Sequence, residues 1–532
     1  MKICTKILFL CSLFCLGACS WLDIEPEGEA TSDKLFKTGD GYRSVISGVY
    51  KAMTSKNLYG MELQFGLVDC ISQQYSWNWS AGSMGDVTDI YKEAKAFNYR
   101  NVDLRKAIDA IWADGYNVIA NTNNLIQNIE NASPDIFAGG EMERKMIMGE
   151  AYACRALMHF DLCRLFAPAP VENETGLYLP YVETYPNIQP MGIEVKPFLD
   201  KVVIDLKKAL DLTADFDTTA LGMSVSASSN SRFAGYLENG MEGYQQESSI
   251  DDFYMGRGFR LSYYAITAIL ARVYQYMGND LEAFNTAKQV MEFKAKGISG
   301  TSLDMFTSDD WYSLMDDKIE ERKNLKMPSN LIFALYNEDA YIDYNLDSYF
   351  KKSVSDNNAG KWFVADLEGQ KIFKKADGND DEREADYRGK YLLFVPDYEQ
   401  FSWNPQYVSA KWYCSSSEKI RQDNVEILPV IRATEMRYIM AEHYARESQF
   451  DAAYQILNQI RSNRGLYEPL TQKNNFEGFM EDMVRDAQRE WISEGQLFYL
   501  YKRLGWKVQI GNSKRKMTKA EYMFPLPDNQ SM

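Results

Sequence analysis

One internal repeat constrains the fold of this chain more than any other feature of its sequence. A pattern of small, aromatic and aliphatic residues recurs after 170 residues. Small residues let two helices approach closely, an aromatic ring fills the gap between them, and Gly makes the turn. Two helical hairpins are therefore predicted, the first from Leu270, Ala271, Tyr274, Gly278, Ala283, Ala287 and Val290, and the second from Met440, Ala441, Tyr444, Ser448, Ala453, Leu457 and Ile460.

The first copy of this repeat follows the tetratricopeptide pattern. Tandem units of that kind recur about every 34 residues. The two copies here are much farther apart, so we expect scattered tetratricopeptide-like helix pairs within one domain, and not a regular solenoid.

Other helices are expected in the first half of the chain. Apolar residues at helical spacing predict two long amphipathic helices, over 108–129 and 147–165. Pro134 lies between them and Pro168 ends the second, so they are expected to form an antiparallel hairpin. A third helix is predicted over 195–212, and the fold class is mainly α.

Long irregular segments separate the predicted helices. Residues 215–260 are rich in Ser, Gly, Asn and Tyr, and residues 299–420 mix acidic turns with strand-like runs at 331–335 and 391–395. Minor β structure is therefore expected. Long loops inside a compact protein usually carry function. No change in composition marks a linker, so residues 32–532 are predicted to form one domain.

The amino terminus resembles an export signal. Lys2 and Lys6 flank an apolar run, Ile7–Leu16, about half as long as the roughly 20 residues of a membrane-spanning helix. The run ends in Leu-Gly-Ala-Cys at 16–19, which resembles the bacterial lipobox. We predict a lipoprotein signal peptide over 1–18, lipidation of Cys19 and an acidic tether over 19–31. A plain signal peptide that happens to contain Cys is the alternative.

Few cysteines remain after this segment. Besides Cys19 they are Cys70, Cys154, Cys163 and Cys414, too few to frame a fold of this size with disulfides. Cys154 and Cys163 lie about 13 Å apart along one predicted helix, too far to bridge. Buried free thiols are expected.

The charge balance excludes one class of partner. Lys and Arg total 58 against 75 Asp and Glu, a net charge of −17 that becomes −19 without Lys2 and Lys6. Nucleic acid is therefore a poor partner, because each phosphate contact would oppose this field.

Several segments spread over nearly the whole chain carry one resemblance. They are the acidic lipoprotein start, 149–166 followed by Pro168, 428–432 leading into 436–445, 489–490, 494–495, 502–505 and 524–527. Together these segments resemble the SusD/RagB family. The resemblance implies a mostly helical, lipid-anchored outer-membrane protein that faces the cell exterior. It also implies that the protein binds a nutrient, usually an oligosaccharide, and passes it to a SusC-like TonB-dependent transporter.

The last long helix departs from the family pattern at two positions. Leu497 and Leu500 stand where the family commonly has Arg and Asp. A structural ion pair at this place is therefore in doubt, whereas the fold is not.

Catalytic signatures are weak. His159 and His443 are the two histidines of the chain, each on a predicted core helix, which favours structural roles over a metal centre or a His-based triad. No nucleophile elbow, phosphate loop or dinucleotide fingerprint is present. The acidic run Asp377–Asp386 fits no EF-hand and is interpreted as a solvated charge run. We predict no enzyme activity, no metal and no cofactor.

A binding site is better supported. Sugar rings pack their C–H face on Trp or Tyr, and their hydroxyls need polar side chains beside the ring. The run Tyr75-Ser76-Trp77-Asn78-Trp79 has this composition and no helical period. We predict that Tyr75, Trp77, Asn78 and Trp79 contact ligand with Asp69, Gln73 and Gln74 as polar companions. A core role for one of the Trp residues is the alternative.

A second aromatic pair, Trp311-Tyr312, follows Asp309-Asp310 in a loop region and is also predicted to contact ligand. Weaker candidates are Tyr341, Tyr344, Tyr349 and Trp403, which could instead be local plugs. Trp112, Trp491 and Trp506 accompany helical stripes and are expected in the core.

The sequence thus predicts a surface lipoprotein that binds an oligosaccharide without altering it. Three alternatives remain open: capture of peptides as in RagB-like members, a secreted helical glycoside hydrolase or lyase, and a structural lipoprotein that docks another envelope protein.

Overall fold

The structure is a computed structural model of the whole chain. It describes residues 35–76, 89–186, 191–233, 250–296, 302–307, 311, 314–351, 362–375, 381–397 and 405–528.

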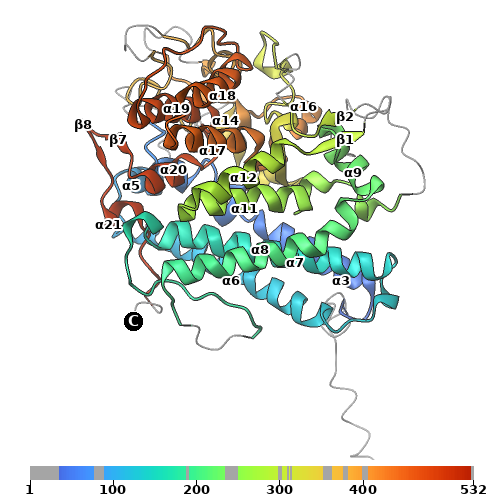
Figure 1. Cartoon of the computed structure of the whole chain (residues 1–532). Helices are drawn as coiled ribbons and strands as arrows, with labels where there is room; N and C mark the ends of the chain where they lie inside the picture. Colours follow the sequence, from blue (N-terminus) through green and yellow to red (C-terminus); the bar gives the residue numbers. More distant parts are fainter. Residues whose placement is uncertain are drawn as a thin grey trace, which may run out of the picture.

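The described chain is mainly α, as predicted, and its long helices form one continuous stack (Figure 1). In chain order, each helix of the stack packs on the next. The nine helices concerned, among the described residues, are α3 (Gly39–Met53), α6 (Val102–Ile129), α7 (Gly140–Phe166), α8 (Val195–Asp217), α11 (Tyr263–Met277), α12 (Asp280–Met291), α17 (Ala433–Arg446), α18 (Phe450–Ser462) and α19 (Phe476–Glu490).

The hairpin predicted at 108–165 is present as α6 and α7, but α7 is not amphipathic as predicted. Almost every side chain of its second half is buried, because α7 lies between α6 and α8 and contacts α3 and α11 as well. Its charges are neutralised inside the protein. Arg155 donates both to Oδ1 and to Oδ2 of Asp205 at 2.7 Å, and Glu150 accepts from Arg257 at 2.6 Å.

Both copies of the internal repeat form the predicted helix pairs, α11–α12 and α17–α18. Gly278 (φ +80°) and Ser448 (φ +60°) occupy the same left-handed turn position. In each turn the next amide donates to the carbonyl of the repeated Tyr, Tyr274 at 2.9 Å and Tyr444 at 2.7 Å. The pairs are not scattered, however, because α12 packs directly on α17 although residues 292–432 separate them.

Strands are a minor component, as predicted. The described residues contain four two-stranded antiparallel sheets. In the pair β3–β6, Leu331 lies opposite Arg432 and Tyr336 opposite Ile427. The strands are β1 (Lys294–Lys296) with β2 (Ser302–Asp304), β3 (Leu331–Tyr336) with β6 (Ile427–Arg432), β4 (Leu393–Phe394) with β5 (Val408–Ser409), and β7 (Lys507–Ile510) with β8 (Ser513–Lys516).

Shorter helices lie in the connections between these elements. The described ones are α4 (Leu67–Ile71), α5 (Asp89–Lys95), α9 (Ala220–Ser226), α10 (Ser229–Arg232), α13 (Ala340–Asp343), α14 (Leu346–Phe350), α15 (Tyr387–Tyr391), α16 (Glu418–Val425), α20 (Leu497–Leu504) and α21 (Lys519–Tyr522). None of the helices in the described part is both long and apolar enough to cross a bilayer.

The four described cysteines are buried free thiols, as expected.

The acidic run Asp377–Asp386 was only partly predicted correctly. Asp381 and Glu384 are exposed, but Glu382 and Asp386 are buried. Glu382 accepts from Arg461 at 2.9 Å, and Asp386 accepts from Arg388 at 2.8 and 2.9 Å, so burial is compensated by ion pairing.

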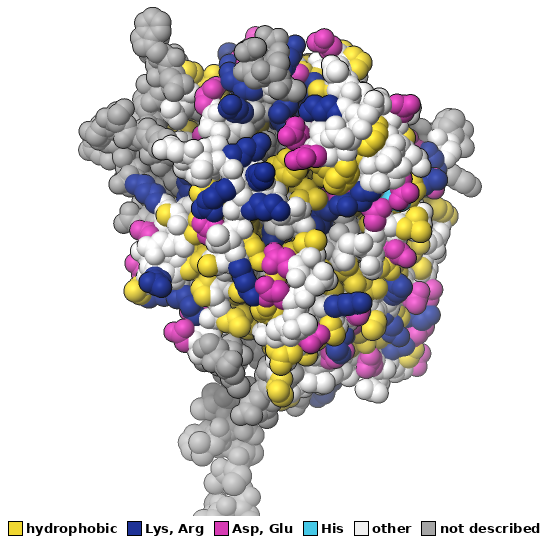
Figure 2. Space-filling view, turned by 60° about the vertical axis from the view of Figure 1, so that its left-hand side comes forward, with side chains coloured by type: hydrophobic (Ala, Val, Ile, Leu, Met, Phe, Trp, Pro, Cys, Tyr) yellow, Lys and Arg dark blue, Asp and Glu magenta, His cyan; other side chains and the backbone are white. Residues whose placement is uncertain are grey.

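The surface charge is unevenly distributed. The face that carries β7 and β8 groups many Lys and Arg side chains, with acidic and hydrophobic side chains among and below them (Figure 2). Lys507, Lys514, Arg515 and Lys516 belong to these two strands. A protein with a net charge of −17 therefore presents a locally basic face.

Candidate functional site

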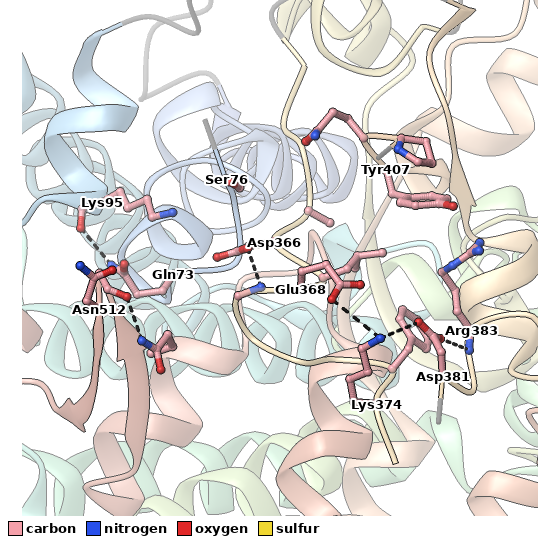
Figure 3. A pocket seen from close by; sticks show the side chains of 18 residues that line it. Gln73, Ser76, Lys95, Asp366, Glu368, Lys374, Asp381, Arg383, Tyr407 and Asn512 are labelled. Atoms are coloured by element: carbon pink, nitrogen blue, oxygen red, sulfur yellow. Dashed lines mark hydrogen bonds and ion pairs between the residues drawn. The ribbon is translucent and has the colours of Figure 1, made fainter. Parts of the chain in front are cut away.

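A cavity of about 540 Å³ in the described chain is lined mainly by polar side chains (Figure 3). Gln73, Lys95 and Asn512 lie on one side of it, and Tyr407, Arg383 and Asp381 on the other. Its lining residues come from segments that are far apart in the chain: Gln73 and Ser76 after α4; Lys95 of α5; Ala365–Gly369, Phe373 and Lys374; Asp381 and Arg383; Pro405–Tyr407; and Gln509, Gly511 and Asn512 of the β7–β8 hairpin.

Backbone hydrogen bonds bring three of these segments side by side. Tyr75 forms an antiparallel bridge with Ala365, and the amide of Ala365 donates to the carbonyl of Tyr407 at 2.8 Å. The amide of Ser76 donates to the carbonyl of Val364 at 2.9 Å. The loop after α4 is thus held in the cavity wall by a short extended pairing as far as Ser76.

Two of the predicted ligand residues lie beneath this wall and not on the surface. Tyr75 is 0% exposed, and its hydroxyl lies 3.1 Å from Oγ of Ser493 and donates to Asp69 Oδ2 at 3.4 Å. Asp69 also accepts from the amide of Gly495 at 3.1 Å, and burial raises the pKa of its carboxyl. Both side chains anchor the loop to the turn between α19 and α20.

The other members of the predicted aromatic run, Trp77, Asn78 and Trp79, lie outside the described residues, as do Tyr312 and Cys19. Ser76, which directly precedes Trp77 in the chain, lines the cavity. Of the polar companions, Gln73 lines the cavity and donates from Nε2 to the carbonyl of Lys95 at 2.9 Å.

Trp311 is buried away from this cavity. Its ring is 7% exposed, packs against Tyr387 and donates from Nε1 to the carbonyl of Asn463 at 2.8 Å. Tyr344 and Tyr349 are also buried, so they act as plugs. Trp112 and Trp491 lie in the core as expected.

The charges that line the cavity include equal numbers of each sign. Lys374 lies 3.5 Å from a carboxylate oxygen of Asp381 and 3.8 Å from one of Glu368. Lys95 donates to the carbonyl of Tyr75. Burial lowers the pKa of Lys95 and raises the pKa of Asp366. The wall thus offers alternating donors and acceptors without a dominant charge.

Tyr407 is an aromatic residue of this wall that sequence reasoning missed. Its ring is half-buried, and the guanidinium carbon of Arg383 lies 4.4 Å from the ring centre. Its position four residues after the candidate Trp403, in the same irregular segment, is the sequence signal that could have identified it. An apolar ring beside polar groups is what a polyhydroxylated ligand requires.

The two histidines do not build a reactive centre. His159 is fully buried; it accepts from the amide of Val182 at Nε2 and its Nδ1 lies 2.9 Å from the carbonyl of Arg155. Burial lowers the pKa of His159 to about 3, so the ring is neutral and structural. His443 pairs with Asp280 at 2.5 Å between α17 and α12. Within the described ranges, no group of three His, Cys, Asp or Glu residues could hold a metal ion.

Comparisons with known proteins show what this chain is similar to. The SusD-like family model, described as "Starch-binding associating with outer membrane", matches residues 20–233. SusD-like protein P2 of Formosa agariphila is 26% identical over 165 residues, which span 31% of this chain and 30% of that protein. The amino-terminal part of the chain is thus similar to SusD-like proteins.

Solved structures show that this chain has the SusD-like fold over most of its length. A SusD superfamily protein from Bacteroides thetaiotaomicron aligns with a TM-score of 0.62 at 20% identity, over 91% of this chain and 92% of that one. Surface glycan-binding protein A from Bacteroides fluxus aligns with a TM-score of 0.60 at 16% identity, over 92% and 96%.

Proposed function

We propose that this protein is a cell-surface lipoprotein of the SusD/RagB family that binds an oligosaccharide and delivers it to a SusC-like TonB-dependent transporter of the outer membrane. Residues 1–18 act as its signal peptide, Cys19 carries the lipid, residues 19–31 form the tether, and residues 32–532 form the binding domain. The lipobox at 16–19 supports the anchor. The proposed binding needs no catalysis and no cofactor.

The polar cavity beside Tyr407 is the observation that carries the binding part of the proposal. It combines an aromatic ring, paired charges and amide side chains, and it is lined by Ser76, which directly precedes the Trp77-Asn78-Trp79 run in the sequence. A neutral sugar chain can replace water at such a wall, because its hydroxyls both donate and accept. The names of the related solved structure from Bacteroides fluxus and of the matching family model agree with a glycan ligand.

Within this proposal the predicted site residues take different roles. Trp77, Asn78 and Trp79 contact the ligand together with Tyr407. Tyr75 and Asp69 hold the loop from below. Trp311 is buried, so it positions the segment from which Tyr312 reaches ligand.

Substitution of Tyr407 by Ala tests the proposal. We expect the mature protein to bind a member of a broad oligosaccharide panel in calorimetry, and Tyr407→Ala to weaken that binding about tenfold or more, since an aromatic–sugar contact is worth about 1.4 kcal/mol. Tyr467→Ala is the matched control, because Tyr467 is 71% exposed and does not line the cavity.

Other outcomes would decide against this function. Unchanged affinity in Tyr407→Ala would remove the cavity from the proposal. Binding of peptides without any glycan would favour the RagB-like alternative. Release of shorter sugars from a polysaccharide, abolished by one Asp or Glu substitution, would establish a hydrolase.

A further inference from the structure

A second cavity of about 280 Å³ lies on the opposite face of the segment that walls the first. Lys374 and Asp381 form an antiparallel bridge and line the first cavity, whereas their neighbours Lys375 and Glu382 line the second. This alternation follows from extended backbone, in which successive side chains point to opposite faces. The second cavity therefore belongs to a different site.

One face of α19 forms the floor of this cavity. Asp482, Arg485, Asp486 and Arg489 follow the i, i+3, i+4, i+7 spacing of a single helix face, and all four line the cavity. Arg461, at the end of α18, faces them. In total, five basic and four acidic side chains line the cavity, in a protein whose net charge is −17.

The acidic groups of this cavity already have partners. Glu382 accepts from Arg461 at 2.9 Å and lies 2.7 Å from Arg489 Nη1. Asp486 accepts from Arg388 at 2.9 Å. Asp482 accepts from Lys473 at 3.0 Å.

Three arginines of the cavity have guanidinium N–H groups that donate no hydrogen bond to these acids. Nε of Arg461 and Nη2 of Arg489 are buried and have no hydrogen-bond acceptor among the described residues. The side chain of Arg489 is only 1% exposed. Arg485 is paired only with Asp482 among the described carboxylates, at 3.7 Å, which is too long for a hydrogen bond. Burial lowers the pKa of Arg485, and the nearby charge of Arg489 adds to this effect.

Buried guanidinium donors without acceptors are costly, and an oxyanion satisfies several of them at once through charge-assisted hydrogen bonds. We propose that the cavity between α18, α19 and the segment around Glu382 binds an oxyanion, a sulfate or a carboxylate. The volume is far larger than the roughly 30 Å³ of one water molecule, so the anion enters either free or as a substituent of an acidic sugar.

Calorimetry on the mature protein at constant ionic strength tests this site. The probes are sodium sulfate, sodium glucuronate and glucose, with sodium chloride as the baseline. We expect saturable binding of sulfate, glucuronate or both, and Arg485→Gln to weaken it at least tenfold. Arg515→Gln, outside the cavity on β8, should bind as the wild type does.

Arg485 is a suitable target because its side chain is 26% exposed and has one long ionic contact, so the variant should fold. Lys473→Gln at the cavity rim is a second variant, expected to weaken binding by a smaller factor. Sulfate binding alone identifies a free anion as the ligand, and preferential binding of glucuronate identifies an acidic sugar.

The proposal is overturned if neither anion binds beyond the chloride baseline, if glucuronate is the one anion that binds and glucose binds as tightly, or if Arg485→Gln has no effect. It does not rest on the proposed glycan function. Tyr407→Ala should leave anion binding unchanged, so failure at one cavity is distinguishable from failure at the other.

Discussion

At the scale of single residues, the interior charges of this protein are organised in groups that neutralise one another. Glu494 is buried and accepts from Arg432 through two hydrogen bonds of 2.7 Å and from Lys411 at 2.6 Å. Burial raises the pKa of Glu494, but the two cations outweigh burial and hold the pKa below its ordinary value. These three residues come from β6, from the segment after β5 and from the turn after α19.

Replacing Glu494 by Gln should destabilise the protein by about 3–5 kcal/mol, because it leaves Arg432 and Lys411 buried without their counter-charge. Urea unfolding measures this difference. The control is Asp103→Asn, which breaks an ion pair with Lys106 whose two side chains are each 72% exposed. That change should cost less than about 1 kcal/mol. Equal effects of the two substitutions would contradict the compensated-charge interpretation.

At the scale of elements, ion pairs join helices that are distant in the chain. Leu497 and Leu500 of α20 stand in place of the charged residues whose ion pair the sequence put in doubt. A different ion pair joins α20 to α17, from Arg503 to Glu442 at 2.6 and 2.8 Å. Burial raises the pKa of Glu442, but Arg503 and Arg446 outweigh it and lower the pKa to about 2.

This pair should make stability depend on pH. The folded pKa of Glu442 lies below its ordinary value of 4.5, so ionised Glu442 stabilises the fold fully above pH 4.5, and this contribution is lost as the pH falls toward 2. The loss amounts to about 3 kcal/mol. Urea unfolding of wild type and Glu442→Gln should therefore differ most near pH 6 and converge toward pH 2. A constant difference over this range would refute the assignment.

Turns between helices differ in how much they tolerate a side chain. Gly495, between α19 and α20, has φ +70°, and a Cβ there would lie 1.9 Å from the carbonyl oxygen of Leu63. Gly278, between α11 and α12, has φ +80° but open space around it. Gly278→Ala should cost about 1–2 kcal/mol from its backbone conformation alone. Gly495→Ala should cost clearly more by thermal or urea unfolding, and a smaller cost would show that this turn yields easily.

At the scale of the whole molecule, helices that are distant in sequence build one stack. Residues 292–432 are inserted between α12 and α17 without separating the two repeat pairs. The entropic cost of closing a long insertion grows slowly with its length, and burial of the helix faces offsets that cost. The inserted segment and the residues after α4 then provide most of the cavity wall.

The proposed attachment to the membrane also concerns the whole protein. Cys19→Ala should move the protein from the outer-membrane fraction to the soluble fraction of cells, because the lipid anchor would be lost. Fractionation and immunoblotting measure this. The purified variant should still bind the same glycans, since residues 89–528 supply Tyr407 and most of its cavity. Retention in the membrane fraction would contradict lipidation at Cys19.

The sequence alone determined the helical class, the two repeat pairs and the free buried thiols, because helix periodicity and turn residues are local properties. It also led to Gln73, which lines the cavity. It failed for Tyr407, for the buried acids Glu382 and Asp386, and for the contact of α12 with α17.

Only the tertiary structure decided these features, since each depends on segments far apart in the chain. The sequence predicts that Glu382 is solvated, whereas the structure places it in ion pairs with Arg461 and Arg489. The sequence predicts that Tyr75 contacts ligand, whereas in the structure its buried hydroxyl lies beside Ser493 and Asp69. Exposure and charge compensation are properties of the packed molecule, and local sequence pattern does not encode them.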